Sequence, residues 1–391
     1  MSVNNVDSGW RRTAARNPTI TASLNNLCRR LPKLKQTLSD YGHLSLVEYV
    51  RYLQSSPSEG YQCAEDFGRV AYEYVLPLLG RETAERLSKQ LANAPLVLTA
   101  NHHGVDFMAQ SVQSSILMSL NSGQPNVVPV LACGNVPLDN MTYPRGALLY
   151  RAEGMSSAAN PLRLPLFPDR LKRSVVSAMQ GADTAMFNRF SGLIENTAVE
   201  QPGLQGSLKV LEQLLKQHYQ SPEVLSCVYY SDQAVILNQR IWKELFQQKA
   251  RTMHASADLA YMELEKVAGA LFVEDLLDSM SLVYKAMTDK TLLRALLPLL
   301  DGVKGCWHQS VLRARWNHYR GSLTPGTDKQ RDRPLNGRNG GSFMFWGLDD
   351  RGKKIPLFVA NTDTEEWTLE GVSDDGGVFS LPFSAIDIAE A

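Results

Sequence analysis

The sequence predicts an α/β protein with a Rossmann-like parallel sheet core, a large helical portion and a small C-terminal β module. Residues 95–135 form two apolar runs separated by a polar turn and an apolar-rich stretch, which is typical of a β-α-β unit. Residues 256–303 contain little proline or glycine and carry apolar side chains at helical spacing. The last fifty residues alternate short apolar runs with turn signals, which favours hairpins.

The composition is that of a folded chain with more than one structural unit. The 391 residues exceed the length of one ordinary domain, and 44% hydrophobic with 20% charged residues excludes wholesale disorder. Forty basic residues balance forty acidic ones, so net charge alone supports neither nucleic acid nor an anionic surface as a partner. Any such claim must come from a local patch.

The cysteine usage and the apolar runs indicate a cytoplasmic protein. The five cysteines stand far apart and form no C-x-x-C pair, so neither a disulfide framework nor a thiolate zinc site is expected. No secretory signal and no apolar stretch long enough to span a membrane is found.

We divide the chain into four segments, beginning with residues 1–94 as a basic start and a helical entry segment. Residues 1–35 hold seven Lys or Arg and one acid, and we expect a solvated, partly disordered stretch, although a nucleic-acid arm stays open. Two or three helices are expected within residues 44–91, where apolar residues recur every three or four positions.

The other three segments are a Rossmann-like core at 95–255, a helical insert at 256–320, and a linker with a β module at 321–391. In the core, the strand from Pro95 ends in a glycine-containing turn, and a helix is expected from Phe107 to Leu120. A second strand covers 127–134. A third candidate strand covers 223–230 and leads into a helix over 234–246.

The turn after the first strand carries the strongest candidate for catalysis. Ligands of open α/β sheets bind beyond the carboxyl ends of the strands, where His102 and His103 lie. If a helix begins near His102, Asp106 lies one turn further on the same face and could orient the imidazole as a general base. Gly104 would admit substrate to the backbone, and Asn101 would contact it or simply cap the helix.

Polar residues after the other strands are candidate substrate contacts. Asn135, Asp139 and Asn140 follow the second strand, and Arg145 offers a cation for a carboxylate or phosphate. Tyr230 and Asp232 follow the third, although Asp232 is also a good helix cap. No glycine-rich phosphate loop and no metal motif occurs, so the cofactor is unknown. The expected partner is a small molecule, an amino acid or an acyl donor.

The order of strand, polar pair with glycine, helix, second strand and polar loop from Leu96 to Asn140 resembles the core of the cysteine-adding ligase of bacillithiol biosynthesis. Leu225 to Phe246 also looks like a later strand and helix of that family. That family has an amide pair where His102 and His103 stand, so its catalytic residues do not transfer. The resemblance implies a ligase or transferase that joins an amino-acid-like amine or thiol compound to a small carbonyl acceptor.

Two alternatives stay open. The histidines and Asp106 resemble the His/Asp motifs of acyltransferases, which use an acyl-CoA or acyl-carrier donor, but the spacing is one residue short of either motif. A non-catalytic binding or scaffold protein is the second alternative. Convergence of the predicted polar residues on one pocket would favour an enzyme, and dispersion would favour the scaffold.

Overall fold

The computed structural model describes residues 17–55, 65–93, 99–102, 105, 127–149, 161–244, 258–300, 340–373 and 377–391. It is a mixed α/β protein with a small parallel sheet and a separate antiparallel sheet near the C-terminus. The predicted helix at 107–120 and the linker up to residue 339 lie outside the described residues. No helix within the described ranges has the length and apolarity needed to cross a bilayer.

The chain divides into two compact units. The first contains Met1–Asn101, Phe107–Leu131 and Gln239–Tyr261. The second contains His102–Asp106, Ala132–Asn238 and Met262–Ala391.

Five helices make up the described residues at the start of the first unit. They are α2 (Pro18–Arg30), α3 (Pro32–Tyr41), α4 (Leu46–Ser55), α5 (Glu65–Leu79) and α6 (Arg81–Asn93). The helices predicted over residues 44–91 are therefore confirmed. The solvated start is corrected in part, because residues from Pro18 onward form a helix that Asn17 caps through hydrogen bonds to the N–H groups of Thr19 and Ile20.

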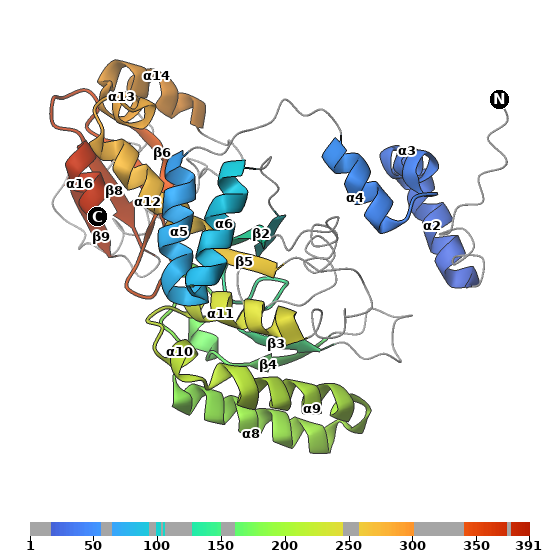
Figure 1. The fold of residues 1–391 in the computed structure, drawn as a ribbon. Helices are drawn as coiled ribbons and strands as arrows, with labels where there is room; N and C mark the ends of the chain where they lie inside the picture. The colour runs from blue at the N-terminus through green and yellow to red at the C-terminus, as the bar shows by residue number, and fades with distance from the viewer. Residues whose placement is uncertain are drawn as a thin grey trace, which may run out of the picture. The chain divides into compact units, whose positions relative to one another are not determined.

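Helices α5 and α6 lie side by side (Figure 1). Gly80 joins them with a φ of 85°, a left-handed conformation that suits glycine at the end of a helix. The facing side chains include Val75, Ala84 and Leu87, all fully buried. This apolar seam stabilises the pair, because neither helix could bury its stripe alone.

The parallel sheet consists of β1 (Thr99–His102), β2 (Val127–Cys133) and β5 (Asp258–Glu263), in the order β1-β2-β5. The first two strands are confirmed. Every residue of β5 is buried, as is usual for strands covered on both faces. Asp258 begins β5 and is balanced by Arg86 at 3.7 Å and Lys243 at 3.3 Å.

The third predicted strand, at 223–230, is wrong. Residues Pro222–Leu225 form the short helix α10, and Tyr229 makes one isolated bridge with Gln180. Proline at the first helical position favours this turn over a strand. The third strand of the sheet is β5, in a stretch predicted to be helical, because a short buried apolar run has no periodicity that separates strand from helix.

The middle of the second unit contains a hairpin and a helical layer. Strands β3 (Gly146–Leu149) and β4 (Leu162–Pro165) pair antiparallel. Helices α8 (Thr184–Glu200) and α9 (Gln205–Leu214) lie side by side, and the helix predicted over 234–246 is confirmed as α11 (Tyr230–Trp242) (Figure 1). The short turns are η2 (Asp169–Leu171), η3 (Val176–Ala178), η4 (Pro202–Leu204) and η5 (Leu215–Tyr219).

The C-terminal β module is confirmed. Strands β6 (Gly341–Leu348), β7 (Lys354–Ala360), β8 (Thr368–Val372) and β9 (Val378–Pro382) form an antiparallel sheet in sequence order. Helices α12 (Leu264–Leu277), α13 (Leu282–Thr288), α14 (Lys290–Leu300) and α16 (Ala385–Glu390) accompany it, and the first three show that residues 264–300 are helical, as the apolar spacing predicted. Phe343 and Val359 from the strands and Trp367, directly before β8, pack with Leu276 and Leu293 in one core.

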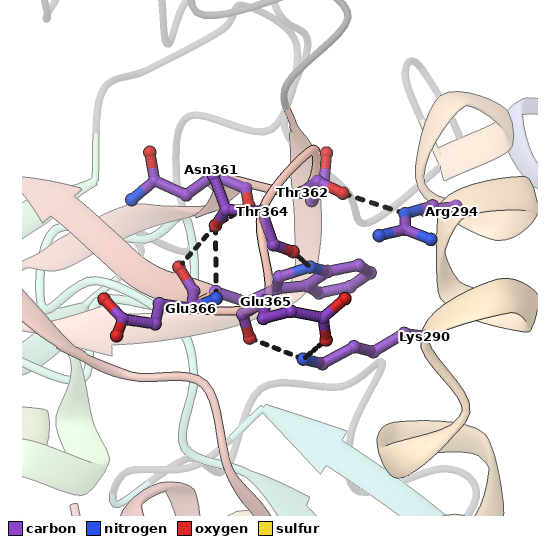
Figure 2. A network of polar contacts seen from close by, with 8 residues as sticks. Lys290, Arg294, Asn361, Thr362, Thr364, Glu365 and Glu366 are labelled. Carbon is purple, nitrogen blue, oxygen red and sulfur yellow. Dashed lines mark hydrogen bonds and ion pairs between the residues drawn. The ribbon is translucent and has the colours of Figure 1, made fainter.

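The loop between β7 and β8 is fastened to α14 by two cations (Figure 2). Lys290 donates to the carbonyl of Glu365 at 2.6 Å, and Arg294 donates to the carbonyl of Thr362 at 2.8 Å. The Arg294 guanidinium lies 5.3 Å from the ring centroid of Trp367, which is buried. These contacts are structural, because each cation is engaged with a backbone carbonyl of the module.

Candidate functional site

The candidate site lies in the second unit, where β2 and β5 end. These strands are neighbours in a parallel sheet, so their last residues, Cys133 and Glu263, lie at the same edge. Helix α12 begins directly after Glu263, and α11 begins at Tyr230. Ligands of such sheets bind at this edge, which makes the polar residues here the first to consider.

Glu263 is the central residue of the site. It is 0% exposed, and among the described residues neither carboxylate oxygen has a hydrogen bond of ordinary geometry. Burial raises the pKa of this carboxyl from 4.5 to about 7, while the neighbouring Lys266 ammonium lowers the pKa and the Glu265 and Asp232 carboxylates raise it. A carboxyl group with this pKa exists in both protonation states at neutral pH, as proton transfer requires.

Glu265, in the first turn of α12, ties this helix to the loop after β2. Its carboxylate accepts the N–H groups of Gly134 at 2.6 Å and Asn135 at 2.8 Å. The Cys133 thiol donates to the same carboxylate at 3.3 Å. Three donors converge on one side chain, so the position of Glu265 is fixed by the loop it binds.

Position 134 needs a glycine, because two carboxylates lie close to its Cα. A Cβ atom at this position would lie 2.8 Å from Oε1 of Glu263 and 3.2 Å from Oε2 of Glu265. The first distance is shorter than any ordinary contact, so a side chain would displace Glu263. The absence of a side chain here therefore lets two carboxylates approach the same point of the backbone.

Lys266 is the cation of the site and contacts three groups. Its ammonium lies 2.7 Å from Oδ2 of Asp232, 3.6 Å from Oε2 of Glu263 and 4.4 Å from the ring centroid of Tyr229. The hydrogen bond goes to Asp232, and Glu263 receives only the weaker electrostatic attraction. Glu263 thus keeps its oxygens available for a proton.

Ser231 adds a second buried polar group without a partner. It is the second residue of α11 and is 0% exposed. Its hydroxyl lowers the pKa of Glu263, yet its oxygen has no hydrogen bond of ordinary geometry. Buried polar atoms without partners are uncommon in folded proteins, and a catalytic site is one of the places where they occur.

Cys133 and Lys354 complete the surroundings. Burial and the Glu265 carboxylate raise the pKa of the Cys133 thiol to about 11, so the sulfur is protonated at neutral pH. This protonation state argues against the nucleophilic use of Cys133. Burial lowers the pKa of Lys354, at the start of β7, while Cys133 and Glu265 act in the opposite direction on it.

The predicted catalytic residues fall mostly outside what can be described. Asn101 and His102 are the last two residues of β1, so His102 lies at the same sheet edge as Cys133 and Glu263. His103, Gly104 and Asp106 lie outside the described residues. Because β1 includes His102, the strand reaches two residues beyond the predicted one.

The predicted substrate contacts separate into two groups. Asn135 and Asp232 belong to the site, the first through its N–H on Glu265 and the second through Lys266. The others lie along the loop leading to β3 or at the start of α11, where they make internal contacts. These residues are Asp139, Asn140, Arg145 and Tyr230.

The contacts of the second group are structural ones. Arg145 is 9% exposed, and it donates to the carbonyl of Phe167 and pairs with Asp169 at 2.9 Å. The Tyr230 hydroxyl is buried and donates to the carbonyl of Pro144. Asp139 is exposed and is held through its backbone N–H, and the Asn140 side chain accepts hydrogen bonds from Thr142.

Sequence reasoning missed Glu263, Glu265 and Lys266, because their stretch was taken as helix. The signal that could have found them is the abrupt change from the apolar DLAYM to the charged ELEK at residues 258–266. Within the ranges described, no set of His, Cys, Asp and Glu has a metal-binding arrangement. Comparisons of the chain with protein-family models, with curated proteins and with solved structures found no match.

Proposed function

We propose that the protein is a ligase- or transferase-type enzyme that joins an amino-acid-like amine or thiol compound to a small carbonyl acceptor, with Glu263 as its proton-transfer group. The observation that carries this proposal is a fully buried carboxyl that has no hydrogen bond of ordinary geometry to any described residue, at the carboxyl end of a parallel strand. Structural carboxylates are normally paired when buried, whereas catalytic ones keep an open position for substrate.

The charges around Glu263 favour an amine as the nucleophile. The Asp232 and Glu265 carboxylates stand near it, and an ammonium group of a substrate would be attracted to this edge. Once that ammonium has released one proton to water, ionised Glu263 would take the second proton from the neutral amine during its attack, and the raised pKa of Glu263 makes the return of that proton accessible at neutral pH. A fatty-acyl chain would find charged groups here, so an acyl-CoA donor has less support.

The chemical step balances with Glu263 alone as proton carrier. The amine or thiol loses its proton to the Glu263 carboxylate as its lone pair forms a bond to the carbonyl carbon. The π electrons of the carbonyl move to oxygen, and their return expels the leaving group. The leaving group departs with the proton held by Glu263, which restores the carboxylate.

The proposal also includes a Rossmann-like core and a role for His102 in proton transfer. The strand order β1-β2-β5 supports the core, and the last residue of β1 is available as a second proton-transfer group at the same edge. The resemblance of Leu96 to Asn140 to the cysteine-adding ligase family supports the same reaction type, because that reaction also needs an amine near a base.

The test is a product screen by mass spectrometry. Wild type is incubated with pools of amino acids, aminothiols and amines against pools of aldehydes, acyl-CoAs, and carboxylates with ATP and magnesium. We expect one condensation product in wild type and a loss of about 100-fold or more in the Glu263→Gln variant. Glu390→Gln, at an exposed position of α16, is the control that should keep the wild-type rate.

Two results would overturn the assignment. A condensation product that the Glu263→Gln variant makes at the wild-type rate would remove Glu263 from the reaction. A wild-type product from acyl-CoA and an alcohol, with no product from any amine or thiol, would replace the proposed reaction by acyl transfer to a hydroxyl. Circular dichroism of each variant distinguishes loss of function from loss of fold.

A further inference from the structure

Helices α2 and α3, residues 18–41, bury none of their own residues. They contact each other, and α3 continues toward α4 through Tyr41, whose ring lies 5.5 Å from that of Tyr49. A helix pair without buried residues gains little from its own packing. The apolar side chains along this helix pair, called the apolar stripe below, therefore remain for a binding partner to cover.

The stripe is regular in sequence and exposed in the structure. Ile20, Leu24 and Leu27 recur at four- and three-residue steps, which places them on one face of α2, and Leu31 follows directly after the last residue of that helix. Ile20 is 45% exposed, Leu27 44% and Leu31 51%. Single exposed leucines are common on protein surfaces, but here three large apolar side chains are exposed within twelve residues of chain.

Four cations border this stripe. They are Arg29, Arg30, Lys33 and Lys35, all exposed. Arg30 follows Leu27 by three residues and so lies on the same side of α2, while Lys33 and Lys35 stand in the first turn of α3, shortly after Leu31.

These charges have little local compensation. The one acidic residue between positions 17 and 41 is Asp40, and its carboxylate accepts hydrogen bonds from Gln36. The Arg29 side chain donates to the carbonyl of Asn25. Among the described residues, none of the four cations takes part in an ion pair.

The combination of charge and exposed apolar area selects among the candidate occupants. A second copy of the chain would cover the leucines but would bring like charges together. A nucleic acid would neutralise the cations but would leave the apolar side chains in water. An anionic lipid surface accommodates both, because apolar side chains enter the acyl boundary while Lys and Arg reach the phosphates.

We infer that residues 18–41 bind the protein peripherally to an anionic lipid surface. Ile20, Leu27 and Leu31 enter the boundary between headgroups and acyl chains, and Arg30, Lys33 and Lys35 contact the headgroup phosphates. This function does not depend on the reaction proposed for Glu263. It would hold the protein at a membrane without any spanning helix.

Vesicle co-sedimentation of the full chain tests this inference. We expect binding to vesicles with a third phosphatidylglycerol, weak binding to pure phosphatidylcholine, and loss of binding at high salt. Each cation near the surface should strengthen binding about fivefold, so Lys33→Gln with Lys35→Gln should weaken it about 25-fold. Leu27→Ser with Leu31→Ser should weaken it about tenfold or more.

Matched controls stand on α9, where Lys209 and Val210 are both exposed. Lys209→Gln with Val210→Ser removes one cation and one apolar side chain elsewhere and should leave vesicle binding unchanged. Equal binding to neutral and anionic vesicles would overturn the inference. So would vesicle binding that both pairs of α2–α3 substitutions leave intact.

Two further measurements separate the other occupants. Fluorescence anisotropy with a labelled single-stranded RNA should show no tight binding, and RNA binding that exceeds vesicle binding would reassign the patch to nucleic acid. Analytical ultracentrifugation should show that the leucine substitutions leave the oligomeric state unchanged. A dimer that dissociates on these substitutions would assign the stripe to self-association instead.

Discussion

Replacing Glu263 by glutamine should make the protein more stable above neutral pH. The carboxyl group has a pKa of about 7 in the folded protein and 4.5 as a free side chain, and burial is the main cause of the difference. Ionised Glu263 therefore costs folding free energy, whereas glutamine of the same size carries no charge. The effect has the opposite sign to the usual outcome of a substitution at a buried position.

The magnitude follows from the difference in pKa. Each unit is worth about 1.4 kcal/mol, so a rise from 4.5 to about 7 amounts to roughly 3 kcal/mol. Because the folded pKa is raised, the stabilising contribution of the carboxyl is complete below about pH 4.5 and is lost as the pH rises through about 7. The gain of Glu263→Gln over wild type should be near zero at pH 4 and reach its full value above pH 8.

The assay is urea denaturation of wild type and Glu263→Gln at half-unit steps between pH 4 and 9. The difference between the two proteins cancels the titration of all other groups whose environment is unchanged. A difference that stays constant with pH, or that favours wild type above pH 8, would refute the account of Glu263 as a buried group with a raised pKa. Carbon-13 NMR of labelled glutamate carboxyls would check the pKa directly.

Three other predictions concern the surroundings of this carboxyl. Lys266→Met removes a cation 3.6 Å from Glu263 and should move the pKa of that carboxyl above 7. Carbon-13 NMR measures this pKa, and an unchanged or lower value would contradict the electrostatic effect of Lys266. Gly134→Ala should lower the free energy of unfolding by about 1–3 kcal/mol, because its Cβ would meet a carboxylate oxygen at 2.8 Å. The matched change Gly192→Ala, in α8 and with nothing within 4 Å, should raise it by roughly 0.5–1 kcal/mol, and equal effects of the two in urea melts would count against the crowding. The Cys133 pKa of about 11 predicts that iodoacetamide labels its thiol slowly at pH 7, and that the labelling rate rises about tenfold per pH unit up to pH 9. Peptide mass spectrometry measures this rate, and a rate that reaches a plateau in that range would place the pKa lower.

Much of the local structure could be predicted because its signals are local. Helices α5 and α6 show apolar residues every three or four positions, and the hairpins of the C-terminal module show turn residues between short apolar runs. Such patterns depend on neighbours within a few positions along the chain. They survive in the tertiary structure because packing acts on the same faces that the patterns mark.

Residues 223–230 and 258–263 have a different secondary structure from the one that the sequence predicted. The first has the composition of a strand, yet proline and a helical turn begin it, and the second reads as helix but lies buried between other elements as β5. Both errors concern short apolar segments, in which a strand and a helix have the same run of apolar residues and no distinguishing periodicity. Long-range pairing decides such cases, and no local signal reports it.

The amino-acid sequence alone established the mixed α/β class, the positions of helices α4 to α6 and α11 to α14, the β module, and the expectation that strand ends in the α/β core carry polar residues. The site itself came from the tertiary structure. Gly134 and Glu263 are far apart in sequence, and the neighbouring positions of β2 and β5 bring them together. The pKa of Glu263 depends on burial by these partners, and burial is a property of the packed chain that a list of residues does not contain.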